Sequence, residues 1–265
     1  MIRIISPDLG GGFGNKVPVY PGYVVSILAS ILTERPVKWI SDKSSNLIST
    51  HFARDVYLKG EMALRKDGRI LGFRMHTTSD HGAFFSDAQP SKFKIGLLHS
   101  AFACYDIPNA RVQGFDVCVN RPRTNAYRAP GSTQVAFAVE TIVDELCEKL
   151  GLDPIEFRLK NGAHEGVRRV DGPVFPRIGM KETVQAIKDS PHWKTPLTGK
   201  YQGRGVATGF WFNCGLKSAA SATVNPDGTV SLLEGSTDIG GSRASISRSE
   251  EHTSELQSRG LISYA

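Results

Sequence analysis

The sequence predicts a mixed α+β fold, because strong signals for β-hairpins and for long amphipathic helices occur in the same chain. Asp67-Gly68 stands between two strand-like segments and is a strong short-range hairpin signal. Residues 132–150 carry one apolar stripe at helical spacing. Within Asn225–Gly228, a proline followed by Asp-Gly indicates a second tight reversal between strands.

The composition is that of a globular protein. The 265 residues are 40% hydrophobic and 22% charged, enough to bury the core of one large domain or two smaller ones. The net charge of +6 is spread over mixed-sign neighbourhoods, which argues against nucleic acid as the main partner. No apolar run approaches the ~20 residues of a membrane span, and the first residues lack the apolar region of a secretory signal. We therefore expect a cytoplasmic protein without a membrane span.

The four cysteines, Cys104, Cys118, Cys147 and Cys214, show no C-x-x-C spacing and stand in apolar contexts. Such cysteines are typical of buried, reduced thiols rather than of disulfides or zinc ligands. The pattern predicts a reducing compartment, and we expect no metal site built from protein side chains.

The N-terminal segment begins with a short apolar strand that leads into four glycines within Gly10–Gly14. Glycines at this density let the backbone approach another group closely. Apolar residues recur at helical spacing over residues 24–32, after Pro21, and predict a buried helix that ends before Pro36. Residues 37–40 are the next strand candidate.

Two long antiparallel strands are expected over residues 54–64 and 70–79, on either side of the Asp67-Gly68 turn. Residues 81–101 mix Gly, Ser, Asp, Pro and isolated aromatics without a sustained period, which predicts an irregular segment facing a site. Residues 111–119 alternate as a strand does.

The helix over residues 132–150 should begin with Ser132 as its N-cap and end at Gly151, where a C-cap glycine fits. Asp153-Pro154 repeats the N-cap and first-turn proline signal and predicts a short helix to about residue 159.

Residues 161–179 are rich in Gly, Pro, Arg and His, which indicates a domain boundary or crossing linker. A short amphipathic helix is expected over residues 180–189. Strands are then expected over residues 210–224 and 229–233, joined by the second reversal.

Three glycine-bearing loops join these elements, at residues 10–14, 126–131 and 237–243. Each could present backbone N–H groups to an anion, and Arg128 and Arg243 add guanidinium groups suited to phosphate. The first loop fits neither the P-loop, because its lysine is misplaced, nor the dinucleotide fingerprint, because no helix follows directly. Taken singly, a loop of this kind is more often a tight turn packed against a strand than a binding site.

Five motifs occur in a fixed order along the chain. They are Gly-Gly-Gly-Phe-Gly-Asn-Lys at 10–16, Arg-Pro-Val-Lys-Trp at 35–39, Ala-Tyr-Arg-Ala-Pro-Gly at 126–131, the run from Glu140 to Asn161, and Asp-Ile-Gly-Gly-Ser-Arg at 238–243. Together they resemble the molybdopterin-binding large subunit of the molybdenum hydroxylases, the family of xanthine dehydrogenase, aldehyde oxidoreductase and aerobic carbon monoxide dehydrogenase. The resemblance covers residues 3–247.

The resemblance implies an α+β molybdopterin-binding fold that is truncated at both ends. It implies a first molybdopterin-binding domain over residues 1–165, the start of a second over 166–247, and a non-native tail over 248–265 that resembles translated sequencing-adapter text. The family's catalytic glutamate is expected beyond the C-terminus. We therefore expect no catalytic residue within the chain, and no activity from the chain alone.

The implied cofactor is a molybdopterin, in its plain or cytosine dinucleotide form, that carries molybdenum and supports hydroxylation of a carbon centre with oxygen from water. [2Fe–2S] clusters and FAD are implied on two partners, an iron–sulfur small subunit and an FAD-binding medium subunit. The residues implied in cofactor binding lie in the three loops: Gly11, Gly12, Phe13, Gly14, Tyr127, Arg128, Ala129, Gly240, Gly241, Ser242 and Arg243.

Four positions depart from the family pattern and narrow the implied small-molecule substrate. Val17 replaces an acidic residue of the purine-oxidising branch and Pro130 replaces its phenylalanine, which argues against xanthine. Ala129 stands where the carbon monoxide branch has a copper-binding cysteine, although the first loop is most similar to that branch. Gly241 replaces a glutamine, so a side-chain donor to the metal ligand is lost. The pattern implies a carbon-monoxide-dehydrogenase-like homologue without the copper site, acting on an aldehyde or an N-heterocycle.

Two alternatives stay open at this point. The same loops could form a non-redox domain that binds an anion or nucleotide, which a pocket without room for a metal centre would indicate. The chain could also be an inert fragment. Under the leading interpretation we expect the three loops to converge on one pocket, because one cofactor has to be held from several sides.

Overall fold

The computed structural model describes residues 5, 9–83, 100–211 and 219–234. These residues belong to two compact units. One unit runs from Val19 to Phe212, and the other combines Met1–Pro18 with Asn213–Ala265. In the described part of the chain, no helix has both the length and the apolar character needed to cross a membrane.

A three-stranded sheet forms the base of the larger unit. β1 (Val56–Leu64) pairs antiparallel with β2 (Ile70–Gly82), and β3 (Ala110–Cys118) pairs parallel with β2. In the turn between β1 and β2, Gly68 has a left-handed φ of 82°, which favours glycine. Asp67 Oδ1 accepts a hydrogen bond from Arg69 N at 3.1 Å in the same turn. The predicted hairpin and third strand are confirmed, with small shifts in their bounds.

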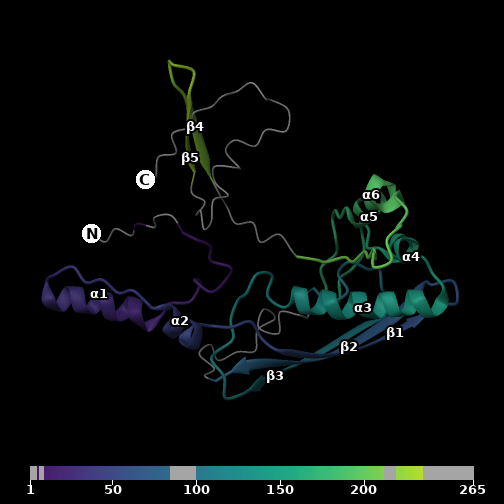
Figure 1. Cartoon of the computed structure of the whole chain (residues 1–265), viewed down its shortest axis with the longest axis horizontal. Coiled ribbons are helices and arrows are strands. Elements are labelled where there is room, and N and C mark those ends of the chain that lie inside the picture. Colours follow the sequence, from purple (N-terminus) through teal and green to yellow (C-terminus); the bar gives the residue numbers. More distant parts are fainter. Residues whose placement is uncertain (1–4, 6–8, 84–99, 212–218, 235–265) are drawn as a thin grey trace. The chain divides into compact units, whose positions relative to one another are not determined.

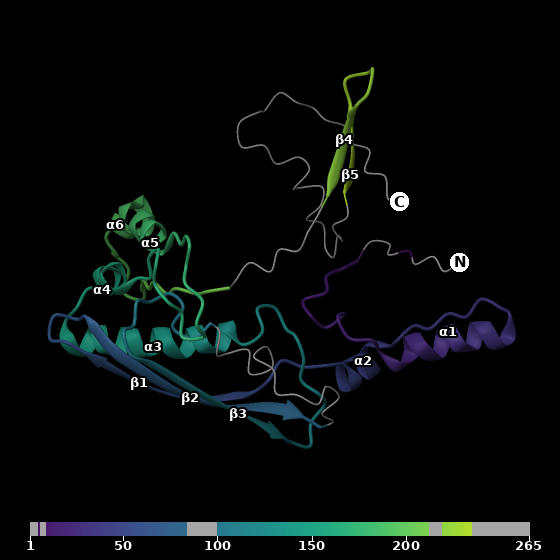
Figure 2. The ribbon, with the colours of Figure 1, turned by 180° about the vertical axis from the view of Figure 1, so that it is seen from behind.

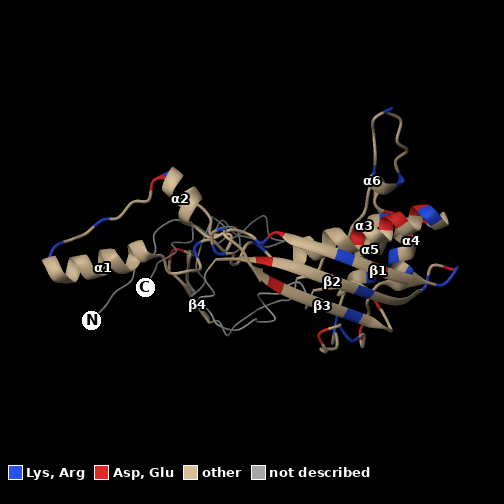
Figure 3. Ribbon diagram, turned by 90° about the horizontal axis from the view of Figure 1, so that it is seen from below, with Lys and Arg blue, Asp and Glu red and all other residues tan. Residues whose placement is uncertain are grey.

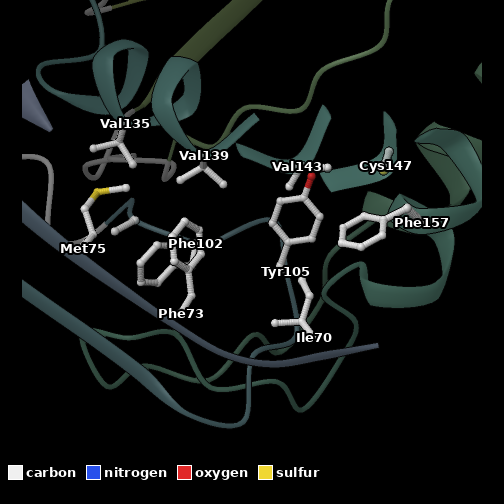
Figure 4. Close-up of a cluster of buried hydrophobic side chains, with 11 residues drawn as sticks. Ile70, Phe73, Met75, Phe102, Tyr105, Val135, Val139, Val143, Cys147 and Phe157 are labelled. Atoms are coloured by element: carbon white, nitrogen blue, oxygen red, sulfur yellow. The ribbon is translucent and has the colours of Figure 1, made fainter. Parts of the chain in front are cut away.

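Helix α3 (Ser132–Leu150) lies along one face of this sheet (Figures 1 and 2). The side chains of β1 alternate between half-buried and exposed, as expected for a strand with one covered face. The main core lies between helix and sheet (Figure 4), and it contains Ile70, Phe73, Met75, Phe102, Tyr105, Val135, Val139, Val143, Cys147 and Phe157. The predicted apolar stripe of residues 132–150 therefore packs on the sheet.

Glycines cap both ends of α3. The N-cap is Gly131, with a φ of 80°, and not Ser132 as predicted. Ser132 instead occupies the first helical position with its side chain buried, because the left-handed turn at Gly131 starts the helix one residue earlier. At the other end, Gly151 has a φ of 63° and donates hydrogen bonds to Cys147 O and Glu148 O, which confirms the predicted C-cap.

Helices α4 (Pro154–Asn161), α5 (Met180–Asp189) and α6 (Pro191–Lys194) follow α3. Asp153 caps α4, because its Oδ1 accepts hydrogen bonds from the backbone N–H groups of Ile155 and Glu156. α5 has the predicted bounds.

The segment expected as a linker, residues 161–179, is packed. Ala163, Val167 and Phe175 are buried together, and Phe210 packs against them. This packing belongs to the larger unit. The division of the chain into domains at residue 165 stays a prediction.

Helix α1 (Pro21–Thr33) forms where the apolar spacing predicts a helix, but the expectation that it is buried is wrong. None of its residues is buried, and Ile31 and Leu32 are 66% and 83% exposed. Apolar spacing determines that the helix forms, whereas burial needs a covering segment, which the described residues do not supply.

Residues 37–40 do not form the predicted strand. The ring of Trp39 contacts that of Tyr23 on α1, with the centroids 5.6 Å apart and the planes nearly perpendicular. The segment therefore packs on a helix instead of pairing with a strand. Helix α2 (Lys43–Ser49), which we did not predict, follows it and begins where Asp42 Oδ1 accepts a hydrogen bond from Ser45 N at 2.8 Å.

The smaller unit contains a hairpin of β4 (Ala220–Val224) and β5 (Val230–Glu234). Its turn is the predicted one, closed by a hydrogen bond from Gly228 N to Asn225 O at 3.0 Å. The prediction that this strand begins at residue 210 is wrong, because Phe210 packs edge-to-face on Phe175 with the ring centroids 5.6 Å apart.

Five regions named in the sequence predictions lie outside the described residues. They are most of the N-terminal strand before Gly10, most of the irregular segment (residues 84–99), Cys214, the third glycine-bearing loop (residues 237–243) and the tail from residue 248 to 265.

The described cysteines are unpaired, and two of them meet the expectation of burial. Cys147 is buried and Cys104 is partly buried. Cys118 is exposed at the end of β3, so the expectation of burial is wrong there. Acidic and basic residues are mixed over the strands and over α3 to α5 (Figure 3), which agrees with the mixed-sign charge pattern of the sequence.

Candidate functional site

Left-handed backbone conformations shape the first glycine loop, residues 10–14. φ is 105° at Gly11 and 50° at Phe13. A Cβ at Gly11 would lie 2.5 Å from the Phe13 ring, so no other residue fits there without displacing that ring. A hydrogen bond from Asn15 N to Gly12 O at 2.9 Å closes the turn. Phe13 is 55% exposed, and the loop thus presents both backbone and an aromatic ring to a ligand.

The second loop, residues 125–131, which we call the arginine loop, ends at the N-terminus of α3. Ala129 has a φ of 56°, and its carbonyl accepts a hydrogen bond from Ser132 N at 3.0 Å. Tyr127 is 55% exposed, and Arg128 is also exposed. Gly131 has no side chain to cap the first turn of α3, whose N–H groups lack intrahelical partners. An exposed arginine in the loop that leads into such a helix end suits an anionic group.

A tight backbone crossing supports the segment that leads into the arginine loop. Gly82, at the end of β2, has a φ of 74°, and its N–H donates to Asp80 Oδ1 at 2.6 Å. A Cβ at Gly82 would lie 2.3 Å from Pro122 O and 2.8 Å from the Cα of Arg123. The end of β2 therefore fixes where residues 122–123 run before they enter the loop.

Gly82→Ala is expected to lower the free energy of unfolding by about 2–3 kcal/mol, because the new methyl group meets backbone atoms in a left-handed conformation. Gly166→Ala is the matched control: Gly166 has a φ of 86°, but no neighbour lies within 4 Å of its Cβ position. Gly166→Ala therefore introduces backbone strain without a steric clash, and it should lower the free energy of unfolding by about 1 kcal/mol. Urea unfolding measures both variants, and equal losses would contradict the crossing as the cause.

Behind the arginine loop, α3 carries a buried ionic cluster that the sequence analysis missed. Glu140 accepts hydrogen bonds from Arg158 Nη2 at 2.7 Å, from the Tyr105 hydroxyl at 2.5 Å and from Thr208 N at 2.9 Å. Burial raises the pKa of Tyr105 well above its usual value, so its hydroxyl keeps its proton and donates a hydrogen bond to Glu140. The sequence signal for this cluster was Glu140, a carboxylate among the apolar residues of α3, because a buried carboxylate needs a hydrogen-bonding or charged partner.

This cluster is structural and does not form a ligand pocket. The cavity beside it measures about 20 Å³ and is lined by Ser100, Ser132 and Thr208, among others. That is room for about one water molecule. Burial raises the pKa of Cys104, which also lines the cavity, to about 11, so its thiol is unreactive at neutral pH.

The structure describes two of the three loops predicted to bind a cofactor. The first glycine loop lies in the smaller unit and the arginine loop lies in the larger one. The third loop, with Gly240, Gly241, Ser242 and Arg243, lies outside the described residues. The convergence of the three loops on one pocket stays a prediction.

Comparison with known proteins gives consistent matches. A family model described as "Molybdopterin cofactor-binding domain" matches residues 1–162. The chain is 42% identical over 206 residues to the carbon monoxide dehydrogenase large chain of Hydrogenophaga pseudoflava, an alignment that covers 73% of this chain and 25% of that protein. The chain spans about a quarter of the length of this curated relative.

Solved structures match in fold as well. The aldehyde oxidoreductase from Desulfovibrio desulfuricans aligns with a TM-score of 0.67 and 26% identity, over 84% of this chain and 25% of that chain. The reconstituted CO dehydrogenase from Oligotropha carboxidovorans aligns with a TM-score of 0.61 and 28% identity, over 89% of this chain and 33% of that chain. These matches confirm the α+β class and the family resemblance carried by the loop motifs. The chain belongs to the molybdopterin cofactor-binding domain family.

Proposed function

We propose that the three glycine-bearing loops hold a molybdenum-carrying molybdopterin. The observation that carries the proposal is that the family match over residues 1–162 contains both described loops, each of which combines left-handed residues with an exposed aromatic side chain, Phe13 in the first and Tyr127 in the second. The proposed ligand-holding residues are Gly11, Gly12, Phe13, Gly14, Tyr127, Arg128 and Ala129 in these two loops, and Gly240, Gly241, Ser242 and Arg243 in the third.

The residues present fit such a group. The left-handed turn at Gly11 and Phe13 packs the Phe13 ring against a glycine and leaves this ring more than half exposed. Arg128 offers a permanent positive charge and several donors, which suit the phosphate of a pterin cofactor. When bound, the cofactor supplies the redox chemistry, and the residues of the chain bind and orient it.

The proposed activity of the complete subunit is that of a molybdenum hydroxylase, which transfers water-derived oxygen to an aldehyde, an N-heterocycle or a related carbon centre. Support comes from relatives whose names include carbon monoxide dehydrogenase, nicotine 6-hydroxylase and aldehyde oxidoreductase. Ala129 replaces the copper-binding cysteine of the carbon monoxide branch, which favours an organic substrate over carbon monoxide.

The finer assignments follow from the same family membership. We propose the plain or cytosine dinucleotide form of the cofactor, an iron–sulfur small subunit and an FAD-binding medium subunit as partners, and a cytoplasmic location. The end of the family match at residue 162 supports a first domain over residues 1–165. The second domain over residues 166–247 and the non-native tail over 248–265 are proposed from the sequence motifs alone.

Cofactor binding by the chain tests the proposal. Molybdopterin isolated from a purified molybdenum hydroxylase is added anaerobically, and the pterin retained after gel filtration is measured by its fluorescence. We expect Arg128→Ala and Gly11→Val each to weaken retention about tenfold, through loss of a charged hydrogen bond and displacement of the Phe13 ring. Arg74→Ala, which removes an exposed ion pair with Glu61, should bind as the unaltered chain does.

Two results would contradict the proposal. One is that neither loop variant changes pterin retention. The other is that the chain retains cytidine diphosphate and no pterin, which would favour the non-redox nucleotide-binding alternative.

A further inference from the structure

We propose that Arg54 is a positioning residue that holds the arginine loop in the conformation presented to the ligand. This inference rests on the proposed function, because it concerns the loop assigned there to cofactor binding. The loop in question is residues 125–131, which carries Arg128.

Arg54 reaches the start of the loop from the extended segment before β1. Its Nη2 donates a hydrogen bond to Asn125 O at 3.0 Å, across 71 positions of sequence. The residue is 8% exposed, so water does not compete for this donor as it would at the surface. The guanidinium thus fixes the first peptide of the arginine loop.

The backbone around Arg54 holds the same part of the chain. Phe52 donates from its N–H to Arg123 O at 3.3 Å and accepts at its carbonyl from Asn125 N at 3.0 Å. Arg54 therefore continues a short parallel pairing between the two segments, and its side chain adds a third bond beyond the last backbone one.

Asn125 passes this constraint on to the loop. Its Oδ1 accepts a hydrogen bond from Ala126 N at 2.6 Å, and its Nδ2 lies 3.3 Å from His51 Nδ1. Both polar atoms of the Asn125 side-chain amide therefore have partners, and this fixes the direction in which the chain continues to Tyr127.

Arg54 also contacts the far end of the loop. Gln134, in the first turn of α3, donates from Nε2 to Arg54 O in a long contact of 3.5 Å. Arg54 therefore contacts both the first residue of the loop and the helix that follows the loop. Residues 126–131 therefore run between two residues that Arg54 contacts, Asn125 and Gln134.

Two opposing effects act on the charge of Arg54. Burial lowers the pKa of this guanidinium, and the negative charge of Asp116 on β3 acts in the opposite direction. An arginine stays charged even when it is buried, and its guanidinium offers a planar set of donors. Lysine at this position would keep the charge but offer a single, shorter point of contact.

Amide hydrogen exchange of the full chain separates this role from a general contribution to stability. In Arg54→Met, exchange over residues 126–131 should become about tenfold faster, the loss expected for a hydrogen bond to a charged group, with a smaller change in Arg54→Lys. Arg158→Met is the matched control, because Arg158 is also a buried arginine but contacts Glu140, Asp144 and Pro154 O instead of the loop. It should speed exchange in α3 and leave the arginine loop unchanged.

Binding of isolated molybdopterin to the same variants links loop order to function. We expect Arg54→Met to bind it about tenfold more weakly than the unaltered chain, and Arg54→Lys to lie between them. If Arg54→Met loses its circular dichroism signal, Arg54→Lys carries both measurements.

The outcomes are distinguishable. Unchanged loop exchange in the Arg54 variants, or equal loosening of the loop in Arg158→Met, overturns the positioning role. A looser loop with unchanged molybdopterin binding overturns its relevance to the ligand while the proposed function stands. If the unaltered chain binds no molybdopterin, the proposed function fails, and the exchange rates still decide whether Arg54 holds the loop.

Discussion

Replacing Glu140 with leucine is expected to lower the free energy of unfolding by about 3–5 kcal/mol, the cost of removing one partner of a buried ion pair. Arg158 is fully buried, and it donates to Glu140 from both Nε at 2.9 Å and Nη2 at 2.7 Å. Asp144, a further acceptor for this guanidinium, is half exposed and does not replace a buried carboxylate. Tyr105 and Thr208 would also lose their acceptor.

Chemical unfolding in urea at neutral pH measures the loss. Glu145→Gln on the same helix is the control: Glu145 forms an exposed pair with Lys149 at 3.8 Å, and its loss should cost less than about 0.5 kcal/mol. The double variant Glu140→Leu, Arg158→Leu should recover part of the loss, because it leaves no unpaired charge. A single variant as stable as the control would show that water reaches Arg158 and that the pair is not buried in solution.

Phe73→Ala is expected to destabilise the larger unit by about 3–5 kcal/mol through the cavity that it leaves. Phe73 is 3% exposed, and its ring stacks on that of Phe102 at a centroid distance of 4.1 Å. The variant loses both the apolar contacts and the aromatic pair (Figure 4).

Leu71→Ala is the matched control for Phe73→Ala. Leu71 lies on the same strand and is 43% exposed, so its truncation should cost about 1 kcal/mol or less. Urea midpoints of the two variants, at unchanged slope, give the comparison. Similar losses at both positions would contradict the assignment of the covered face of β2.

Elements governed by local chemistry could be predicted from the sequence. The turn at Asp67-Gly68 needs a left-handed residue, and α4 needs a side-chain cap, which Asp153 supplies; both signals lie within a few residues of the element. The long apolar stripe of α3 likewise specifies both a helix and its buried face.

Features that depend on distant contacts could not be predicted in the same way. The apolar spacing of α1 specifies a helix but does not say which segment covers it, so its burial was wrongly predicted. A short apolar run such as residues 37–40 is compatible with a strand or with packing on a helix, and the Trp39 contact with Tyr23 decided the outcome.

In the candidate site, too, some residues are indicated by local sequence and others are placed by distant contacts. The glycines and Arg128 of the loops are proposed from their motifs, and the structure shows left-handed conformations at Gly11, Gly14 and Gly131, where glycine is favoured. Arg54 belongs to no motif, and its partner Asn125 is 71 positions away, so no local pattern indicates its role. Glu140 was signalled only by its place within an apolar stripe, and finding Arg158 as its partner required the structure.

The parallel pairing of β2 and β3 has a consequence for the order of events during folding. Only residues 65–69 separate β1 from β2, so the two strands can pair as soon as both are synthesised. β3 pairs parallel with β2, so that its first residue, Ala110, lies beside Phe73 near the start of β2, and this pairing requires closure of a much longer loop than the hairpin does. We therefore expect the hairpin to form first and the docking of β3 to be the slower step. Because residues 119–125 continue from β3 into the arginine loop, we expect this loop to become ordered after the hairpin.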